Sequence, residues 1–219
     1  MKSDYSLRSA TKQECAEVLE KHHYLSVMKL SKGFKSGINY ALIHKVDGVV
    51  GVVIFTGFPV PELVRGLFGL ERNDQTGFFE LSRLCLIPSH QQNEDCITSW
   101  FVAKALKKLK RDTFVRAILS YADADHHSGT IYAACNFEYF GLTDKKCDFF
   151  KRENGEFRKV SRGAVKGIEG EWRPRSQKHR FLILNDRKLR PLWGRQTWKP
   201  KVSPNAELTG APLLARPVE

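Results

Sequence analysis

Features of membrane and secreted proteins are missing from this sequence of 219 residues. It has no apolar run near the roughly 18–20 residues that a membrane-spanning helix needs, and residues 1–8 lack the apolar core of a signal peptide. Its five cysteines form no CxxC pair, and such an odd, scattered set argues against a disulfide framework and against a cysteine zinc site. We therefore expect a cytoplasmic protein without a membrane segment, whose thiols are buried and inert.

Positive charge is nearly balanced over most of the chain and concentrated in one part of it. Residues 1–150 hold 19 Lys and Arg against 17 Asp and Glu, whereas residues 151–204 hold 16 against 5. The formal net charge of +12 therefore comes almost entirely from the second stretch. This segregation favours a nucleic-acid partner, because each phosphate that a Lys or Arg neutralises releases counterions. A basic segment that serves only solubility or non-specific adhesion is the alternative.

With 42% hydrophobic residues, the chain can bury one substantial core. Helical and strand periodicities alternate along it, which indicates an α/β or α+β fold. We expect helices at residues 12–23, 97–111 and 129–136, and strands at 39–44, 49–55, 78–87, 115–122, 137–142, 147–151 and 178–184. A longer loop is expected from residue 58, and a basic loop punctuated by glycines over residues 155–170. The domain is predicted to span residues 1–185, followed by a basic, proline-containing, mobile C-terminal arm over 186–219.

Titratable side chains are unusually dense in the segment 120–132. These thirteen residues contain two aspartates, two histidines, two tyrosines and several hydroxyl groups. The segment lies where a buried strand passes into a short helix, and ligands of open α/β sheets bind beyond the carboxyl ends of strands. A polar loop in which Asp123 and Ser128 serve as turn and capping residues is the alternative. We favour a functional site, because position and composition agree.

A second group, His22-His23-Tyr24, stands where the first expected helix ends. His22 continues the apolar face of that helix, which favours a core histidine. His23 and Tyr24 lie past that face and are placed to enter a cleft. Neither group has the ligand spacing of a metal site, so a metal is expected only if the two groups meet in space.

Several short motifs, taken together, resemble one known family. They are His-Tyr at 23–24, Glu-Leu-Ser-Arg-Leu at 80–84, Ser-Tyr-Ala-Asp at 120–123, Gly-Thr-Ile-Tyr at 129–132, Ala-Cys-Asn-Phe at 134–137, Gly-Leu-Thr at 141–143 and Arg-Pro-Arg-Ser-Gln-Lys-His-Arg-Phe at 173–181. The motifs are similar to those of the Mom family of phage DNA-modification proteins, and the order of elements resembles the GNAT acetyltransferase fold. That resemblance implies a GNAT-like mixed central sheet flanked by helices, with a basic C-terminal arm. It also implies double-stranded DNA as substrate, whose adenine becomes an N6-carbamoylmethyl derivative that protects phage DNA from restriction in the host bacterial cytoplasm.

The resemblance also assigns site residues. By matching position, the catalytic set falls on His23, Tyr24, Asp123 and Tyr132. The neighbouring or substrate-contacting residues would be His22, Ser82, Arg83, Ser120, His127 and Asn136. The nucleic-acid-binding residues would be Arg173, Arg175, Lys178, His179 and Arg180.

The usual donor of GNAT enzymes fits this sequence poorly. Those enzymes bind the pyrophosphate of CoA on an Arg/Gln-x-x-Gly-x-Gly/Ala loop, whereas residues 89–95 here contain no glycine. An aminoacyl-tRNA is therefore favoured over acetyl-CoA as the activated acyl donor, with tRNA as its carrier. Two alternatives stay open: a GNAT acetyltransferase for a small molecule or protein, and a DNA-binding protein without catalytic activity.

A mechanism follows on physical grounds. The exocyclic amine of adenine is buried in the duplex, so the base must be flipped out or reached in an open strand. His23 or Asp123 would accept a proton as the amine attacks an acyl carbon. Tyr24 or Tyr132 would protonate the leaving group or stabilise the oxyanion. Basic residues of 151–201 would bind phosphates, and the tryptophans of the same stretch would stack on bases.

Overall fold

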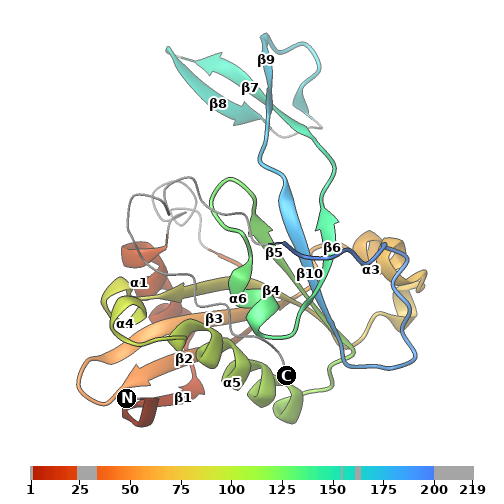
Figure 1. The fold of residues 1–219 in the computed structure, drawn as a ribbon. Coiled ribbons are helices and arrows are strands. Elements are labelled where there is room, and N and C mark those ends of the chain that lie inside the picture. Colours follow the sequence, from red (N-terminus) through yellow and green to blue (C-terminus); the bar gives the residue numbers. More distant parts are fainter. Residues whose placement is uncertain (1, 24–33, 154, 161–163, 200–219) are drawn as a thin grey trace.

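The computed structural model describes residues 2–23, 34–153, 155–160 and 164–199. The main sheet has seven strands in the order β1-β2-β3-β4-β5-β10-β6 (Figure 1). They are β1 (Tyr5–Ser9), β2 (Ile38–His44), β3 (Gly48–Gly57), β4 (Phe78–Leu86), β5 (Ala117–Asp123), β6 (Glu138–Leu142) and β10 (Lys178–Leu184). The helices are α1 (Lys12–His22), α3 (Pro61–Phe68), α4 (Pro88–Asn93), α5 (Ile97–Asp112) and α6 (Thr130–Ala134), with the 3-10 turns η1 (Lys2–Asp4) and η3 (Arg72–Asp74). A mixed sheet flanked by helices confirms the expected fold class.

The main sheet forks between β4 and β5. These two strands lie parallel, and they pair only from Phe78 opposite Ala117 to Leu81 opposite Ser120. The other neighbouring strands of the sheet pair in antiparallel fashion. Beyond the fork, β4 continues beside β3, while β5 continues beside β10. The carboxyl ends of β4 and β5 therefore separate at one edge of the domain.

α1 and α5 cover opposite faces of the main sheet. Side chains alternate between the two faces along a strand, and on β3 Val52 packs in the cluster of α1 whereas Val53 packs in that of α5. α5 supplies the larger core, in which Phe101 is fully buried. α3 packs on β5 and β10 through Leu67, in a cluster of its own. The domain is thus a sheet between two helical layers.

A second sheet projects from the domain. Its strands are β7 (Cys147–Glu153), β8 (Glu156–Val160) and β9 (Gly170–Pro174), in the order β8-β7-β9, and it stands away from the main sheet in Figure 1. We call it the projecting sheet. The prediction of a basic loop over residues 155–170 is therefore wrong for Glu156–Val160, which form β8. Most β8 side chains are exposed, so this strand lacks the apolar alternation that marks a half-buried strand.

Two helices that the sequence did not predict begin at prolines, which interrupt the periodicity of hydrophobic residues. The longer loop expected from residue 58 contains α3, and the polar segment after β4 contains α4. Pro61 and Pro88 each stand in the first turn of a helix, where the missing N–H leaves no intrahelical bond unmade. Gly69, at a φ of 70°, ends α3 in the left-handed conformation. β1 is a further strand that the periodicity did not indicate, because only Tyr5 of its residues is buried.

Residues 186–199 lie against the domain. Leu189 is buried in the cluster of α3, and the indole N–H of Trp198 donates to the carbonyl of Ser128 at 3.0 Å. The first part of the expected arm is thus packed chain, and residues 200–219 lie outside the described residues.

Burial of the cysteines is mixed. Cys15, Cys85 and Cys135 are buried as expected, whereas Cys96 and Cys147 are exposed. None of the helices in the described part of the chain is long and apolar enough to cross a membrane.

Candidate active-site cleft

A cleft opens at the fork of the main sheet, with a volume of about 490 Å³. Its floor is the second half of β4, from Glu80 to Leu86, and the end of β5, from Tyr121 to Asp123. Residues 127–132, which lead into α6, form one wall, and the end of α1 forms another. The cleft therefore lies beyond the carboxyl ends of two parallel strands, where open α/β sheets bind ligands.

Two serine hydroxyls stabilise the fork. Ser120, which is fully buried, donates its hydroxyl to the carbonyl of Leu81 at 3.1 Å. Ser82 donates to the carbonyl of Ile54 on β3 at 3.2 Å, where the pairing of β3 and β4 shifts register. Both hydroxyls thus satisfy carbonyl groups where the regular ladder of hydrogen bonds is interrupted. Ser82 also lines the cleft, whereas Ser120 does not.

His23 brings a neutral imidazole into the cleft. It caps the C-terminus of α1, where its backbone N–H donates to the carbonyl of Leu19 at 3.0 Å. Burial, and then the positive charges of Arg83 and His127, lowers the pKa of His23 to about 4. At neutral pH the ring is therefore a proton acceptor. His22 is exposed and also lines the cleft, so the prediction of a core histidine at this position was wrong: the apolar face of α1 ends before it, at Leu19. Tyr24 lies outside the described residues.

Asp123 organises the turn that forms the opposite wall. Its Oδ1 accepts hydrogen bonds from the Ser176 hydroxyl and, at 3.1 Å, from the backbone N–H of Asp125. Its backbone carbonyl accepts the N–H groups of His126 at 3.1 Å and of His127 at 2.7 Å. Burial, and then the charge of His126, lowers the pKa of His127, which also lines the cleft. One carboxylate and two lowered-pKa imidazoles, those of His23 and His127, therefore face the same cavity.

Tyr132 is held in the cleft wall by a close approach of α6 to β10. Its ring packs on Phe137 and Phe181, with ring centroids 5.5 and 5.3 Å apart. Gly129 precedes α6 at a φ of 83°, and a Cβ there would lie 2.2 Å from the Phe181 ring. Only glycine tolerates both the backbone conformation and the contact. The Gly-Thr-Ile-Tyr motif at 129–132 thus positions its own tyrosine.

Three further residues of the cleft were not predicted as members of this site: Glu80, Tyr121 and Lys178. Burial raises the pKa of Glu80, against the opposing charges of Lys178, Arg83 and Lys35. Burial, and then the charge of Glu80, raises the pKa of Tyr121 to about 12. Lys178 lies over the Tyr121 ring, with its Nζ 5.8 Å from the centroid. A carboxylate inside a strand that is apolar apart from Glu80, Ser82 and Arg83 was the available signal for Glu80, because buried charges need partners.

Asn136 lies elsewhere. It is an exposed residue in the left-handed conformation, with a φ of 63°, just after α6. It lines a separate hollow with Tyr139, Arg195 and Trp198. The structure therefore does not bring its side chain into the cleft with the other predicted neighbours.

The five residues predicted to bind nucleic acid fall into two segments, β9 with the chain just after it and the start of β10, and those of β10 have three different surroundings. Arg173 lies on β9 of the projecting sheet, over the Phe157 ring at 3.7 Å, and Arg175 follows that strand. Lys178 enters the cleft. His179 is 7% exposed and hydrogen-bonds the Tyr139 hydroxyl through Nδ1 at 2.8 Å. Arg180 lies over the Trp193 ring at 4.4 Å.

A short helix stands where GNAT enzymes have their pyrophosphate loop. α4 follows β4 directly, and Cys96, at a φ of 58°, then starts α5. Gln91 of α4 reaches the cleft wall. The geometry in this place is thus a helical turn with polar side chains, and not a glycine loop that exposes successive backbone N–H groups.

The forked sheet with its flanking helices is the GNAT acetyltransferase fold. A structure proposed to be a phosphinothricin N-acetyltransferase superposes with a TM-score of 0.50 and 12% identity, over 82% of this chain and 98% of that one. A proposed acetyltransferase from Salmonella typhimurium with its cofactor acetyl-CoA gives 0.50 and 11%, over 86% and 98%. A proposed acetyltransferase from Acinetobacter baylyi ADP1 gives 0.51 and 7%, over 83% and 93%. Identities this low establish the fold alone.

Within that fold class, the sequence identifies the family. Residues 4–201 match the model of the Mom protein family. The chain belongs to this family. Among curated proteins, none matches it with significant similarity.

Proposed function

We propose that this protein is a transferase that modifies adenine in double-stranded DNA at N6, giving an N6-carbamoylmethyl-type derivative that protects phage DNA from restriction. The observation that carries the proposal is the convergence of His23, Asp123 and Tyr132 in one cleft at the fork. These residues come from the end of α1, the end of β5 and α6, far apart in sequence. The Mom family model covers all three.

Proton transfer in the cleft follows from the pKa values of its groups. The exocyclic amine of adenine loses a proton as it attacks the acyl carbon of the aminoacyl ester; an N–C bond forms, the ester C–O bond breaks, and the tRNA hydroxyl leaves with a proton. With a glycyl donor the first product is N6-glycyl adenine, an isomer of the N6-carbamoylmethyl derivative, so a rearrangement without gain or loss of atoms must follow. His23, with a pKa of about 4, is unprotonated at neutral pH and accepts the first proton. Tyr132 donates a hydrogen bond to the developing oxyanion or to the leaving group. Arg83 and Lys178 place positive charge at the same cavity.

The cleft accepts a single base and not a duplex. Its volume of about 490 Å³ lies in the range typical of small-molecule sites. The target adenine therefore leaves the base stack before it reacts, as in other enzymes that modify bases.

The donor is expected to be an aminoacyl-tRNA in preference to acetyl-CoA. The segment between β4 and α5 is helical and contains no glycine over residues 89–95, so it offers little of the backbone cradle that a pyrophosphate requires. A tRNA would be held through its own phosphates by basic side chains, which this chain has in excess.

DNA is expected to contact the projecting sheet beside the cleft. β10 begins opposite the end of β5, with Lys178 paired to Asp123, so the chain that leaves β9 enters the main sheet at the cleft edge. Ser176, between these strands, hydrogen-bonds the Asp123 carboxylate. On the projecting sheet, Trp172 is 55% exposed and the Arg173 guanidinium stacks on Phe157. Cationic and aromatic groups of this kind bind phosphates and bases.

The decisive experiment expresses the protein in bacteria and analyses deproteinised DNA. Digestion to nucleosides and mass spectrometry should reveal a deoxyadenosine derivative modified at N6, and the purified DNA should resist restriction enzymes with adenine in their sites. A glycyl and a carbamoylmethyl group contain the same atoms, so fragmentation spectra are needed to distinguish an N-acyl from an N-alkyl product. Standard nucleosides alone, from cells with ample folded protein, would refute the proposal.

Matched substitutions test the site. Asp123→Asn and Tyr132→Phe should each lower the modified fraction by at least tenfold, because each removes a group that faces the cleft. Two control variants make the same chemical changes outside the cleft: Asp74→Asn, at an exposed position in a turn, and Tyr40→Phe, at a buried position of β2. Equal losses in controls and cleft variants would place the reaction elsewhere. Binding of CoA with concomitant acetyl transfer would instead favour an ordinary GNAT acetyltransferase.

A further inference from the structure

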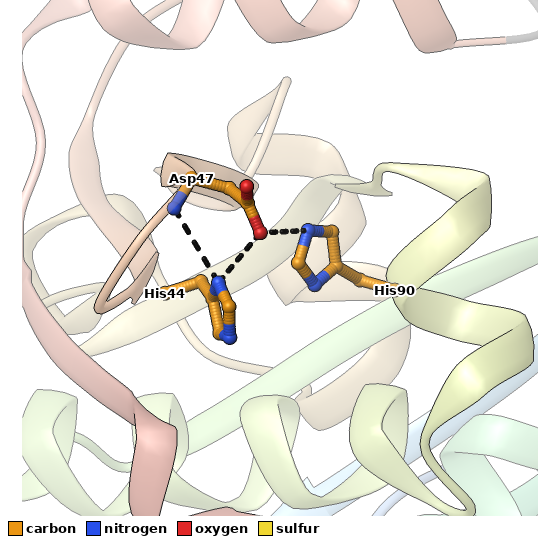
Figure 2. Close-up of side chains that lie close together, drawn as sticks. All are labelled: His44, Asp47 and His90. Carbon is orange, nitrogen blue, oxygen red and sulfur yellow. Dashed lines mark hydrogen bonds and ion pairs between the residues drawn. The ribbon is translucent and has the colours of Figure 1, made fainter.

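A second cluster of titratable side chains lies outside the cleft. His44 ends β2, Asp47 lies in the turn between β2 and β3, and His90 lies on α4. Figure 2 shows both imidazoles directed at the same carboxylate. His44 Nδ1 is 2.6 Å, and His90 Nε2 is 3.3 Å, from Asp47 Oδ2. The three potential ligand atoms lie within 4.8 Å of one another.

Each of the two nitrogen atoms needs a hydrogen atom or a cation between it and the carboxylate oxygen, because an unprotonated nitrogen and a carboxylate oxygen repel each other through their lone pairs. An N–H on each ring, which neutral imidazole can supply, or one bound cation shared by all three groups meets that need. Two histidines and one carboxylate form a recurrent ligand set for divalent transition metals. Metal–ligand bonds of about 2.1 Å in a tetrahedral site separate ligand atoms by roughly 3.4 Å. The observed spacing therefore needs only small side-chain movements to accept an ion.

The surroundings of the cluster favour a cation. The Tyr5 hydroxyl hydrogen-bonds His90 Nδ1 at 2.8 Å, which orients the ring with Nε2 toward Asp47, as outer-shell partners of metal-bound histidines do. Tyr5 also contacts the His44 ring, with centroids 4.9 Å apart. Tyr5 therefore contacts both imidazoles of the cluster and restrains them beside Asp47.

We propose that His44, Asp47 and His90 bind one divalent first-row transition-metal ion, represented by Zn²⁺, which links the β2–β3 turn to α4. Imidazole donors favour such ions over Mg²⁺ and Ca²⁺, which prefer all-oxygen sites. The side chains of His44 and His90 are 17% and 12% exposed, while that of Asp47 is 51% exposed. The ion is therefore held at the surface with room for water as a further ligand.

The site has a structural consequence for the cleft. α4 is a short helix of six residues, and helices of that length have little stability of their own. His90 lies on this helix next to Gln91, which lines the cleft. A metal ion at His90 would hold α4 in place and with it one part of the cleft wall.

Metal binding by the purified full-length protein, after dialysis against a chelator, tests the proposal without DNA or donor. Zn²⁺ titration calorimetry should give one equivalent, and Co²⁺ should give visible d–d bands. His44→Gln, Asp47→Asn and His90→Gln should each weaken affinity by more than tenfold. Tyr5→Phe should weaken it by about tenfold, as loss of an outer-shell partner does.

Two matched controls complete the test. His126→Gln, in the exposed pair His126–His127, and Asp74→Asn should leave both stoichiometry and affinity as in the wild type. Addition of Zn²⁺ should raise the melting temperature of the wild type and leave that of His90→Gln unchanged. Absence of stoichiometric binding at micromolar Zn²⁺ would overturn the proposal and identify the cluster as an ion pair. Binding that survives in all three ligand variants, or disappears in His126→Gln, would overturn it equally.

Discussion

Acidification should destabilise this protein through His23. The residue is 8% exposed, and burial, followed by the charges of Arg83 and His127, lowers the pKa of its imidazole to about 4. In the unfolded chain an imidazole has a pKa of about 6.5. Between these values the unfolded state binds a proton that the folded state does not bind. The free energy of unfolding therefore decreases as the pH falls from about 6.5 to about 4.

The magnitude follows from these two pKa values. Linkage predicts a loss of about 2 kcal/mol between pH 7.5 and pH 5, and a limiting loss of roughly 3 kcal/mol below pH 4. This is a large share of the roughly 5–15 kcal/mol by which a typical domain is stable. His127 acts in the same direction, because its pKa is also lowered, mainly by burial. The contribution of His23 must therefore be isolated by substitution.

Urea unfolding at pH 7.5, 6 and 5 provides the assay. The wild type should lose about 2 kcal/mol more stability between pH 7.5 and pH 5 than His23→Gln, whose side chain does not titrate. His22→Gln, at the exposed neighbouring position, should retain the pH dependence of the wild type. NMR titration of the His23 ring gives a direct second measurement. Identical pH dependence in the wild type and His23→Gln, or a titration midpoint near the ordinary value, would refute the reasoning.

Three other predictions concern the fork, the cleft wall and the DNA contacts. Ser120→Ala should lower the free energy of unfolding by about 1–3 kcal/mol in urea titrations, because a buried carbonyl loses its donor; a neutral effect would contradict the role of the hydroxyl at the fork. Gly129→Ala should destabilise by at least about 1 kcal/mol and reduce DNA modification, because its Cβ would meet the Phe181 ring 2.2 Å away; wild-type Tm and activity would refute this. DNA affinity, measured by fluorescence anisotropy, should fall as salt rises, and a plot of log K against log salt concentration should have a slope of roughly −0.9 per phosphate contact. The double variant Arg173→Ala/Arg175→Ala should reduce the magnitude of that slope by about 2 on every sequence tested. An unchanged slope would show that DNA does not contact these arginines.

Local sequence signals predicted much of the secondary structure, and failed where both faces of a segment are exposed. α5 and β4 were predicted within a residue, because each has a buried face with clear periodicity. β8 has almost no buried side chains, so nothing in its hydrophobic pattern distinguishes it from a loop. α3 was missed for another reason: a loop was expected from residue 58, where prolines interrupt the strand pattern, although Pro61 occupies the first turn of a helix.

The predicted site was recognised from residue chemistry and a family resemblance, and its composition changed when the chain was folded. His23, Asp123 and Tyr132 meet at the cleft, in agreement with the grouping expected. Asn136 faces another hollow, and Lys178 belongs to the cleft wall instead of an outer phosphate-binding surface. Sequence position cannot separate these cases, because the direction of a side chain depends on where its strand or turn meets the rest of the sheet.

By itself, the sequence determined the fold class, the family and the uneven distribution of positive charge, since each depends on composition, periodicity or short motifs. Only the tertiary structure decided that β4 and β5 separate after Leu81 and Ser120, which opens the cleft between them. It alone brought Glu80 beside Lys178, and His44 and Asp47 beside His90. These contacts join segments far apart in the chain, and long-range pairing depends on how strands are ordered and helices packed, which no local pattern of residues records.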